Sequence, residues 1–196
     1  MKGAVFIERD GVLNEPIIDQ GKVRAPRCLD EFKVRAAAAP ALDRLRAAGL
    51  LAIATTNQPG LSDGTLPRRD LDLMHAVLTR RLPLDGVLVC PHLPGDGCMC
   101  RKPRPGLVRE AAFRWALRPE HCFVISDKAA DAEMARHVGA TSLLIRSPWN
   151  GSGHHDLCVT DLEEAVEKTL AHALVLTGRA TPPARPTRRQ PMPLAA

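Results

Sequence analysis

Three short apolar runs limit the folds open to this chain more than any other feature of its 196 residues. The runs cover residues 4–7, 50–54 and 122–125, have the composition of buried strands, and each ends abruptly in polar residues. The segments between them have helical spacing. Strands that alternate with helices predict a doubly wound, mostly parallel α/β sheet. Because such sheets bind ligands at the carboxyl ends of their strands, we expect the polar residues there to form one site.

The expected helices follow from apolar residues at a repeat of about 3.6 residues. Leu42, Leu45 and Ala48 follow this repeat, and Gly49 is placed to end their helix. The remaining expected elements are helices at 71–78, 105–117, 129–138 and 161–176, and strands at 87–89 and 142–145. No insertion is large enough for a cap domain. We therefore expect an open site covered only by loops near residues 12–30, 58–66 and 90–102.

The polar residues after the three runs are of complementary kinds. Glu8 and Asp10 follow the first run, and in an extended segment this spacing points both carboxylates to the same side. An acid-x-acid-Gly sequence also occurs in solvated turns, so it indicates a site only together with the polar residues that follow the other two runs. These are Thr55, Thr56, Asn57 and Gln58 after the second run, and Asp127, Lys128 and Asp131 after the third. With Lys102 added, the set contains a nucleophilic carboxylate, a second acid, oxygen ligands for magnesium and a cation for phosphate, as phosphoryl transfer requires.

A second site is predicted in the loop that precedes Lys102. Three thiols and one imidazole lie within a short Pro- and Gly-rich segment, at Cys90, His92, Cys98 and Cys100. Thiolates and a neutral imidazole complete the tetrahedral shell of a structural zinc and leave no open position for chemistry. The alternative is buried or incidental cysteines around a surface histidine. A zinc would hold the loop rigid and fix the angle at which Arg101 and Lys102 reach the neighbouring site.

Composition fits one enzyme-sized domain over residues 1–177. Hydrophobic residues make up 45% of the chain. No apolar run approaches the length of a membrane span, and the amino terminus enters a strand without a signal-peptide pattern. We therefore expect a cytoplasmic protein with reduced thiols, in which the cysteines outside the zinc loop are packing residues: Cys28, Cys122 and Cys158. The histidines His75, His154 and His155 are not expected in any site.

The net charge of +5 raises the question of a nucleic-acid partner. Four of these five charges belong to arginines in a Pro-, Ala- and Arg-rich segment at 178–196 that contains no acid. Its composition is typical of disorder, and we interpret it as a solvated extension rather than a partner-binding arm. Tyrosine is absent, and Trp115 and Trp149 are the two tryptophans, so stacking on bases is not expected. We expect a monomer with no nucleic-acid or membrane partner.

Four motifs, in this order along the chain, resemble the haloacid dehalogenase superfamily: IERDGV from Ile7, TTNQPG from Thr55, CPHLPGDGCMCRKPRPG from Cys90 and ISDKAAD from Ile125. Within it the chain is most similar to the zinc-containing branch that holds D-glycero-D-manno-heptose 1,7-bisphosphate phosphatase and the histidinol-phosphate phosphatases. The sequence RKPRPG at 101–106 is more typical of the heptose enzyme. The resemblance implies a Mg²⁺-dependent phosphatase with a phosphorylated sugar as its substrate.

The resemblance also implies a role for each residue that matches a family motif. Glu8 holds the place of the nucleophile, and Asp10 holds that of the general acid/base. Magnesium would be held by Glu8, Asp127 and the backbone carbonyl of Asp10. The implied contacts to phosphate and substrate are Thr56, Asn57, Arg101, Lys102 and Lys128, with Asp131 supporting the acidic site. Zinc would be held by Cys90, His92, Cys98 and Cys100.

Three positions depart from the family pattern. The family nucleophile is aspartate, whereas Glu8 adds a methylene that pushes the attacking oxygen outward by about 1.5 Å. A misplacement of about 1 Å can cost on the order of 10²-fold in rate, so this departure is the most serious. Ser126 stands where a glycine is usual, and Asp63 stands where a basic residue is frequent. Two alternatives therefore remain: a homologue that binds a phosphorylated sugar or a partner without turnover, and a histidinol-phosphate phosphatase.

Overall fold

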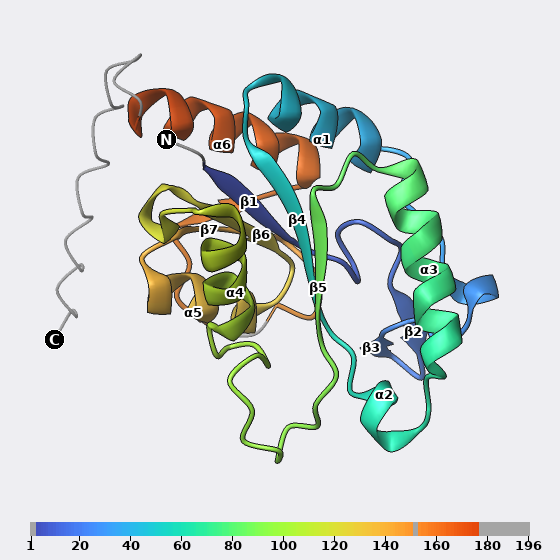
Figure 1. The fold of residues 1–196 in the computed structure, drawn as a ribbon. Helices are drawn as coiled ribbons and strands as arrows, with labels where there is room; N and C mark the ends of the chain where they lie inside the picture. The colour runs from blue at the N-terminus through green and yellow to red at the C-terminus, as the bar shows by residue number, and fades with distance from the viewer. Residues whose placement is uncertain (1–2, 151–152, 177–196) are drawn as a thin grey trace, which may run out of the picture.

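The fold of residues 3–150 and 153–176 is described by a computed structural model (Figure 1). Six parallel strands form one sheet in the order β5-β4-β1-β6-β7-β8. Their bounds are Ala4–Glu8 for β1, Leu51–Asn57 for β4, Gly86–Cys90 for β5, Phe123–Ser126 for β6, Thr141–Ile145 for β7 and Leu157–Val159 for β8. The doubly wound parallel sheet is thereby confirmed. The segment 178–196 lies outside the described residues, so its disorder and the domain boundary at 177 stay predictions.

Helices cover both faces of this sheet. They are α1 (Ala38–Ala47), α2 (Gly60–Asp63), α3 (Arg68–Arg81), α4 (Gly106–Trp115), α5 (Ala129–Val138) and α6 (Leu162–Leu176). Val5 and Ile7 of β1 belong to a core that also contains buried residues of α1, α3 and α6. Ala4 and Phe6 belong to a second core, under α4 and α5, which lie together on one side of the sheet in Figure 1. Burial on both faces explains why β1 is continuously apolar up to Glu8, its last residue.

The segment expected to be a loop at 12–30 contains a two-stranded antiparallel ribbon, which corrects the sequence interpretation. Its strands are β2 (Ile17–Asp19) and β3 (Lys22–Arg24). Gln20 and Gly21 connect them with φ angles of 48° and 75°, the left-handed conformation that tight hairpin turns use. Arg24 donates to both carboxylate oxygens of Glu31 at 2.8 Å, which ties the ribbon to the 3₁₀ helix at Leu29–Glu31.

The cysteines outside the metal loop differ in burial. Cys122 is buried and Cys28 is half-buried, in line with a packing role. Cys158 is exposed, so the expectation that it packs in the core was wrong. It lies on the edge strand β8, where alternate side chains point outward while Val159 is buried. Among the described helices, none combines the length and the apolar character that crossing a membrane would require.

Candidate active site and metal centre

The carboxyl ends of β1, β4 and β6 meet at one edge of the sheet, where these strands end in Glu8, Asn57 and Ser126. A cavity of about 350 Å³ lies there. Seven of the expected site residues line it: Glu8, Asp10, Asn57, Arg101, Lys102, Lys128 and Asp131. The β2–β3 ribbon supplies Val23 and Arg24 to another part of the wall. The fold therefore brings residues from four separate motifs to one cavity.

Glu8 lies at the centre of a buried cluster of charges. Its Oε2 contacts the Lys102 ammonium, and its Oε1 accepts the backbone N–H of Asp10 at 3.2 Å. Lys128 Nζ lies 3.3 Å from the same Oε1. Burial alone would raise the pKa of Glu8, but the charges of Lys102 and Lys128 outweigh it and lower the pKa to about 2. Glu8 is therefore a carboxylate at neutral pH, which is the state that a nucleophile needs.

Lys102 joins Glu8 to a second buried acid, Asp131, whose Oδ1 lies 2.7 Å from Nζ. Burial alone would lower the pKa of Lys102, but the carboxylates of Asp131 and Glu8 raise it. Burial raises the pKa of Asp131 to about 6, even though the Lys102 charge opposes the rise. Lys102 is thus a cation held between two acids at the floor of the cavity.

Asp10 is fixed by donors on both of its carboxylate oxygens. Thr56 Oγ1 and Gln58 Nε2 donate to Oδ2 at 3.0 and 2.7 Å. Arg9 donates to Oδ1 from Nε at 3.1 Å and from Nη2 at 2.9 Å. In this structure the Thr56 hydroxyl bonds to Asp10, and its expected contact with phosphate stays a prediction. The arrangement leaves Asp10 only 6% exposed, at the edge of the cavity.

Sequence reasoning gave no role to Arg9, yet its side chain is completely buried. Its Nη1 lies 3.0 Å from Nε2 of His75 on α3, and its guanidinium carbon lies 5.4 Å from the ring centroid of Phe32. Because arginine has no acceptor, His75 Nε2 accepts this hydrogen bond. Burial lowers the pKa of His75 to about 4, and the Arg9 charge adds to the shift. The two residues are 66 positions apart, so only the fold reveals the contact.

Asp127 is buried just after β6 and is held by residues that the sequence did not single out. Its Oδ2 accepts the indole N–H of Trp149 at 2.7 Å, and its backbone carbonyl accepts from Asn150 Nδ2 at 2.7 Å. Burial raises its pKa. Gly11, with a φ of 101°, packs so closely that a Cβ there would collide with the Asp127 carboxylate. Glycine at this position is therefore what allows the β1 turn to approach β6.

The three oxygens that the resemblance assigns to magnesium converge on one region. Lys128 Nζ lies 2.7 Å from the Asp10 backbone oxygen, 3.3 Å from Glu8 Oε1 and 3.9 Å from Asp127 Oδ1. Within the described residues, Asp127 Oδ1 is buried and accepts no hydrogen bond. Carboxylate and carbonyl oxygens are the ligands that Mg²⁺ prefers, so this donor set fits the ion.

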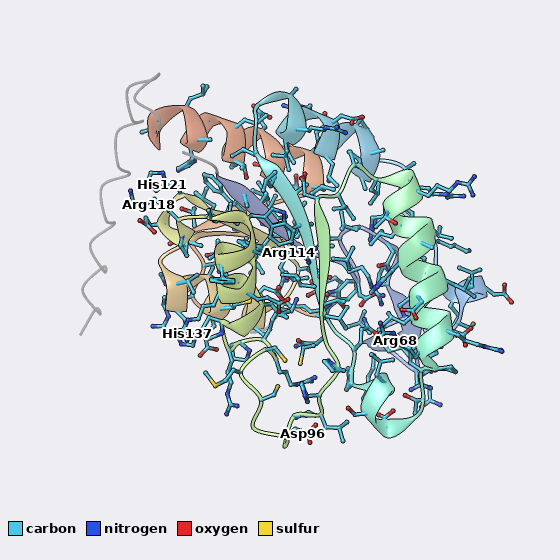
Figure 2. The ribbon with its side chains drawn as sticks, in the orientation of Figure 1. Arg68, Asp96, Arg114, Arg118, His121 and His137 are labelled. Carbon is cyan, nitrogen blue, oxygen red and sulfur yellow. The ribbon has the colours of Figure 1, made fainter. Side chains whose placement is uncertain are left out.

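The four residues expected to bind zinc form one cluster, in the loop between β5 and α4. Their ligand atoms all lie within 4.8 Å of one another. Cys98 Sγ is 3.7 Å from the sulfurs of both Cys90 and Cys100, and His92 Nδ1 is 3.2 Å from Cys100 Sγ. A tetrahedral zinc with Zn–S bonds of about 2.3 Å separates neighbouring sulfurs by about 3.8 Å, so the cluster has the dimensions of such a site. Figure 2 shows Asp96 at the tip of this loop, far from the sheet.

Asn57 connects the metal loop to the catalytic cavity. Its Oδ1 accepts the backbone N–H of Lys102 at 3.2 Å, and its Nδ2 donates to the Lys102 carbonyl at 3.3 Å. Arg101 Nη1 donates to the backbone carbonyl of His92 at 2.9 Å. Arg101 is thus fixed to the loop, and Lys102 is fixed to the end of β4.

The two smaller departures from the family pattern are accommodated locally. Ser126 is buried, and its Oγ accepts the backbone N–H of Lys128 at 3.0 Å, so the added side chain stabilises the turn after β6. Asp63 accepts hydrogen bonds from the backbone N–H and the hydroxyl of Thr65 at 2.9 and 2.6 Å. It is exposed and does not line the cavity.

Comparisons with known proteins agree with this geometry. A HAD-hydrolase-like family model matches residues 99–154. A D-glycero-α-D-manno-heptose-1,7-bisphosphate 7-phosphatase of Mycobacterium tuberculosis is 37% identical over 144 residues, which cover 70% of this chain and 74% of that protein. The histidine biosynthesis bifunctional protein HisB of Legionella pneumophila is 33% identical over 150 residues, which cover 74% of this chain. The matched part spans only 42% of HisB.

A solved structure extends the similarity to the whole sheet. The D,D-heptose 1,7-bisphosphate phosphatase of B. bronchiseptica, complexed with magnesium and phosphate, has a TM-score of 0.74 at 28% identity, covering 88% of this chain and 100% of that one. The similarity in sequence and in fold defines the class of protein to which the chain belongs. The chain belongs to the haloacid dehalogenase superfamily, in the branch that contains the heptose bisphosphate phosphatases.

Proposed function

We propose that this chain is a Mg²⁺-dependent phosphatase that hydrolyses D-glycero-D-manno-heptose 1,7-bisphosphate to the monophosphate. The observation that carries the proposal is the convergence of Glu8, Asp10 and Lys102 on one cavity, with Asp127 Oδ1 3.9 Å from Nζ of Lys128, which also lines it. An ionised carboxylate, a second acid and a buried cation are the groups that phosphoryl transfer to an enzyme carboxylate requires. The relatives named for this bisphosphate, at 28–37% identity, support the choice of substrate.

In the proposed reaction Glu8 attacks the phosphorus, and the bond from phosphorus to the sugar oxygen breaks as the bond to the Glu8 carboxylate forms. Asp10 gives its proton to the departing sugar oxygen. Asp10 then takes a proton from water as the water oxygen attacks the phosphorus and releases Glu8. The sum is one ester and one water converted to one sugar hydroxyl and one phosphate. Asp10 is within reach of both steps because Arg9, Thr56 and Gln58 hold it beside Glu8.

The other site residues neutralise and orient the phosphate. Magnesium would be held by Glu8, Asp127 and the Asp10 carbonyl, where it would neutralise the charge of the transferring group. Lys102 is charged and lines the cavity, so it would pair with a phosphate oxygen once its contact with Glu8 is relaxed. Arg101 lines the same cavity and would contact the rest of the substrate. Asn57 and Lys128 also line it and, together with Thr56, would contact the phosphate.

We further propose that the cluster of Cys90, His92, Cys98 and Cys100 holds one structural zinc per chain. Four soft ligands at tetrahedral spacing leave no position for a reacting group. We expect elemental analysis of protein purified without chelators to give about one equivalent of zinc, and removal of the metal to lower the melting temperature. A content below about half an equivalent would contradict the proposal.

Two competing functions have specific support. The direct contact between Glu8 and Lys102 favours a protein that binds a sugar phosphate without turning it over, because both groups are engaged with each other. The 33% identity to HisB favours a phosphatase of histidinol phosphate. Both alternatives are separable from the main proposal by direct assay.

The experiment is a turnover assay of the purified chain with Mg²⁺, with heptose 1,7-bisphosphate and histidinol phosphate as parallel substrates. We expect phosphate release from the heptose bisphosphate, with a higher kcat/KM than for histidinol phosphate. The reverse preference would select the histidinol enzyme. Calorimetric binding of either substrate without phosphate release would select the binding protein.

A further inference from the structure

The buried guanidinium of Arg9 connects the proposed general acid/base, Asp10, to helix α3. Burial of an unpaired charge is costly, so each donor of a fully buried arginine needs a partner. Nε and Nη2 donate to Asp10, and Nη1 donates to His75 Nε2 at 3.0 Å. The Phe32 ring, 5.4 Å from the guanidinium carbon, packs against its face.

The position of His75 on α3 places its Nε2 acceptor next to Nη1 of Arg9. It lies one turn after Leu71 and one turn before Leu78, which are both buried against the sheet, so its ring points toward the same layer. The helix that carries it, α3, is anchored by Met74, which is also completely buried. The imidazole therefore pairs with Nη1, the one guanidinium nitrogen that does not donate to Asp10.

We propose that His75 is a positioning residue for catalysis, which acts through Arg9 to hold the Asp10 carboxylate in the geometry of proton transfer. The inference rests on the proposed phosphatase function. His75 contacts neither substrate nor reacting atoms, and its effect is on Asp10. On Asp10, Thr56 and Gln58 donate only to Oδ2, whereas Arg9 donates to Oδ1 from Nε and Nη2 and also to Oδ2 from Nη2 at 3.0 Å. Arg9 is therefore the partner that holds both oxygens and with them the rotation of the carboxylate.

A set of four variants tests this role. His75→Gln keeps an acceptor at the place of Nε2, His75→Asn moves the acceptor back by about one bond, and His75→Leu removes it. Leu73→Ala, on the same helix at a residue 50% exposed, is the matched control. The substrates are heptose 1,7-bisphosphate and p-nitrophenyl phosphate, whose leaving oxygen needs no proton. Melting curves check that each variant is folded.

For the sugar substrate, we expect His75→Leu and His75→Asn to lower kcat by about 10-fold with KM changed by less than about 2-fold. His75→Gln and Leu73→Ala should stay within about 2-fold of the parent. The loss of kcat/KM with p-nitrophenyl phosphate should be smaller, because kcat/KM reports the steps up to departure of the leaving group and Asp10 then has no leaving group to protonate. If His75→Leu does not fold, the difference in kcat between His75→Gln and His75→Asn still tests whether the position of the acceptor matters.

Two results with the variants would overturn the inference, and two with the parent protein would overturn the proposed function. Equal kcat values for Gln and Asn would show that the acceptor position does not matter. An equal loss of kcat/KM with both substrates would indicate a general structural defect. A parent that hydrolyses p-nitrophenyl phosphate but no sugar phosphate would refute the proposed function itself, and a parent inactive on both would refute that function and the catalytic role of His75 together.

Discussion

Replacing Glu8 with aspartate is expected to raise kcat for sugar-phosphate hydrolysis by about 10-fold or more. The shorter side chain draws the carboxylate back toward β1 by about 1.5 Å, one carbon–carbon bond. In the present structure Glu8 Oε2 is in direct contact with Lys102, so the cation that should meet the phosphate is partly engaged by the nucleophile. Aspartate would release Lys102 and restore the reach that the family mechanism implies. Steady-state kinetics of the two proteins at saturating Mg²⁺ provide the measurement.

Glu8→Gln is the control for this comparison, because it keeps the length of the side chain and removes its charge. Activity that survives in this variant must come from another residue or a contaminant. A parent that turns over well and loses activity as Glu8→Asp would contradict the prediction, and would indicate that the neighbouring groups are arranged for the longer acid. Binding of sugar phosphate by both proteins, with turnover by neither, would favour the binding-protein alternative.

The arrangement of the sheet was predictable because each central strand is buried on both faces. Ala4, Phe6 and Ile53 belong to one core while Val5 and Ile7 belong to the other, so the strands are continuously apolar and stand out in the sequence. The β2–β3 ribbon was missed because each strand has three partly exposed residues, too few to show an alternating pattern. The Gln20–Gly21 pair was the available signal, and Gln-Gly is weaker than Asn-Gly as a hairpin signature.

The site was predictable to the extent that its residues lie at strand ends. Glu8, Asn57 and Asp127 follow or end parallel strands, and parallel strands present their carboxyl ends at one edge. The partners that hold those residues were not predictable in the same way. Trp149 reaches Asp127 from a loop 22 residues later, and His75 reaches Arg9 from a separate helix. Such contacts depend on how helices and loops pack on the sheet, which local periodicity does not specify.

Lys102→Met is expected to lower kcat by about 10²- to 10³-fold, the usual cost of removing one preorganised charge-stabilising group. The same change should destabilise the fold by about 3–5 kcal/mol, because Glu8 and Asp131 then face each other, buried without the cation between them. The two effects have different causes. The loss of kcat comes from the charge that develops on phosphate, and the loss of stability comes from the desolvation of two carboxylates.

A second substitution separates these effects. Asp131→Asn in the Lys102→Met background removes one of the two facing charges, so denaturant unfolding should show recovery of part of the lost stability while kcat stays low.

The loss of stability in Lys102→Met should also be smaller at pH 5 than at pH 7. Without Lys102 the folded-state pKa of Glu8 rises above its unfolded value, and the pKa of Asp131, which burial already raises, rises further. The folded protein of this variant therefore binds extra protons at low pH and loses that advantage as pH rises. A Lys102→Met protein that is fully active and as stable as the parent at both pH values would show that Lys102 neither binds the phosphate nor compensates the buried acids.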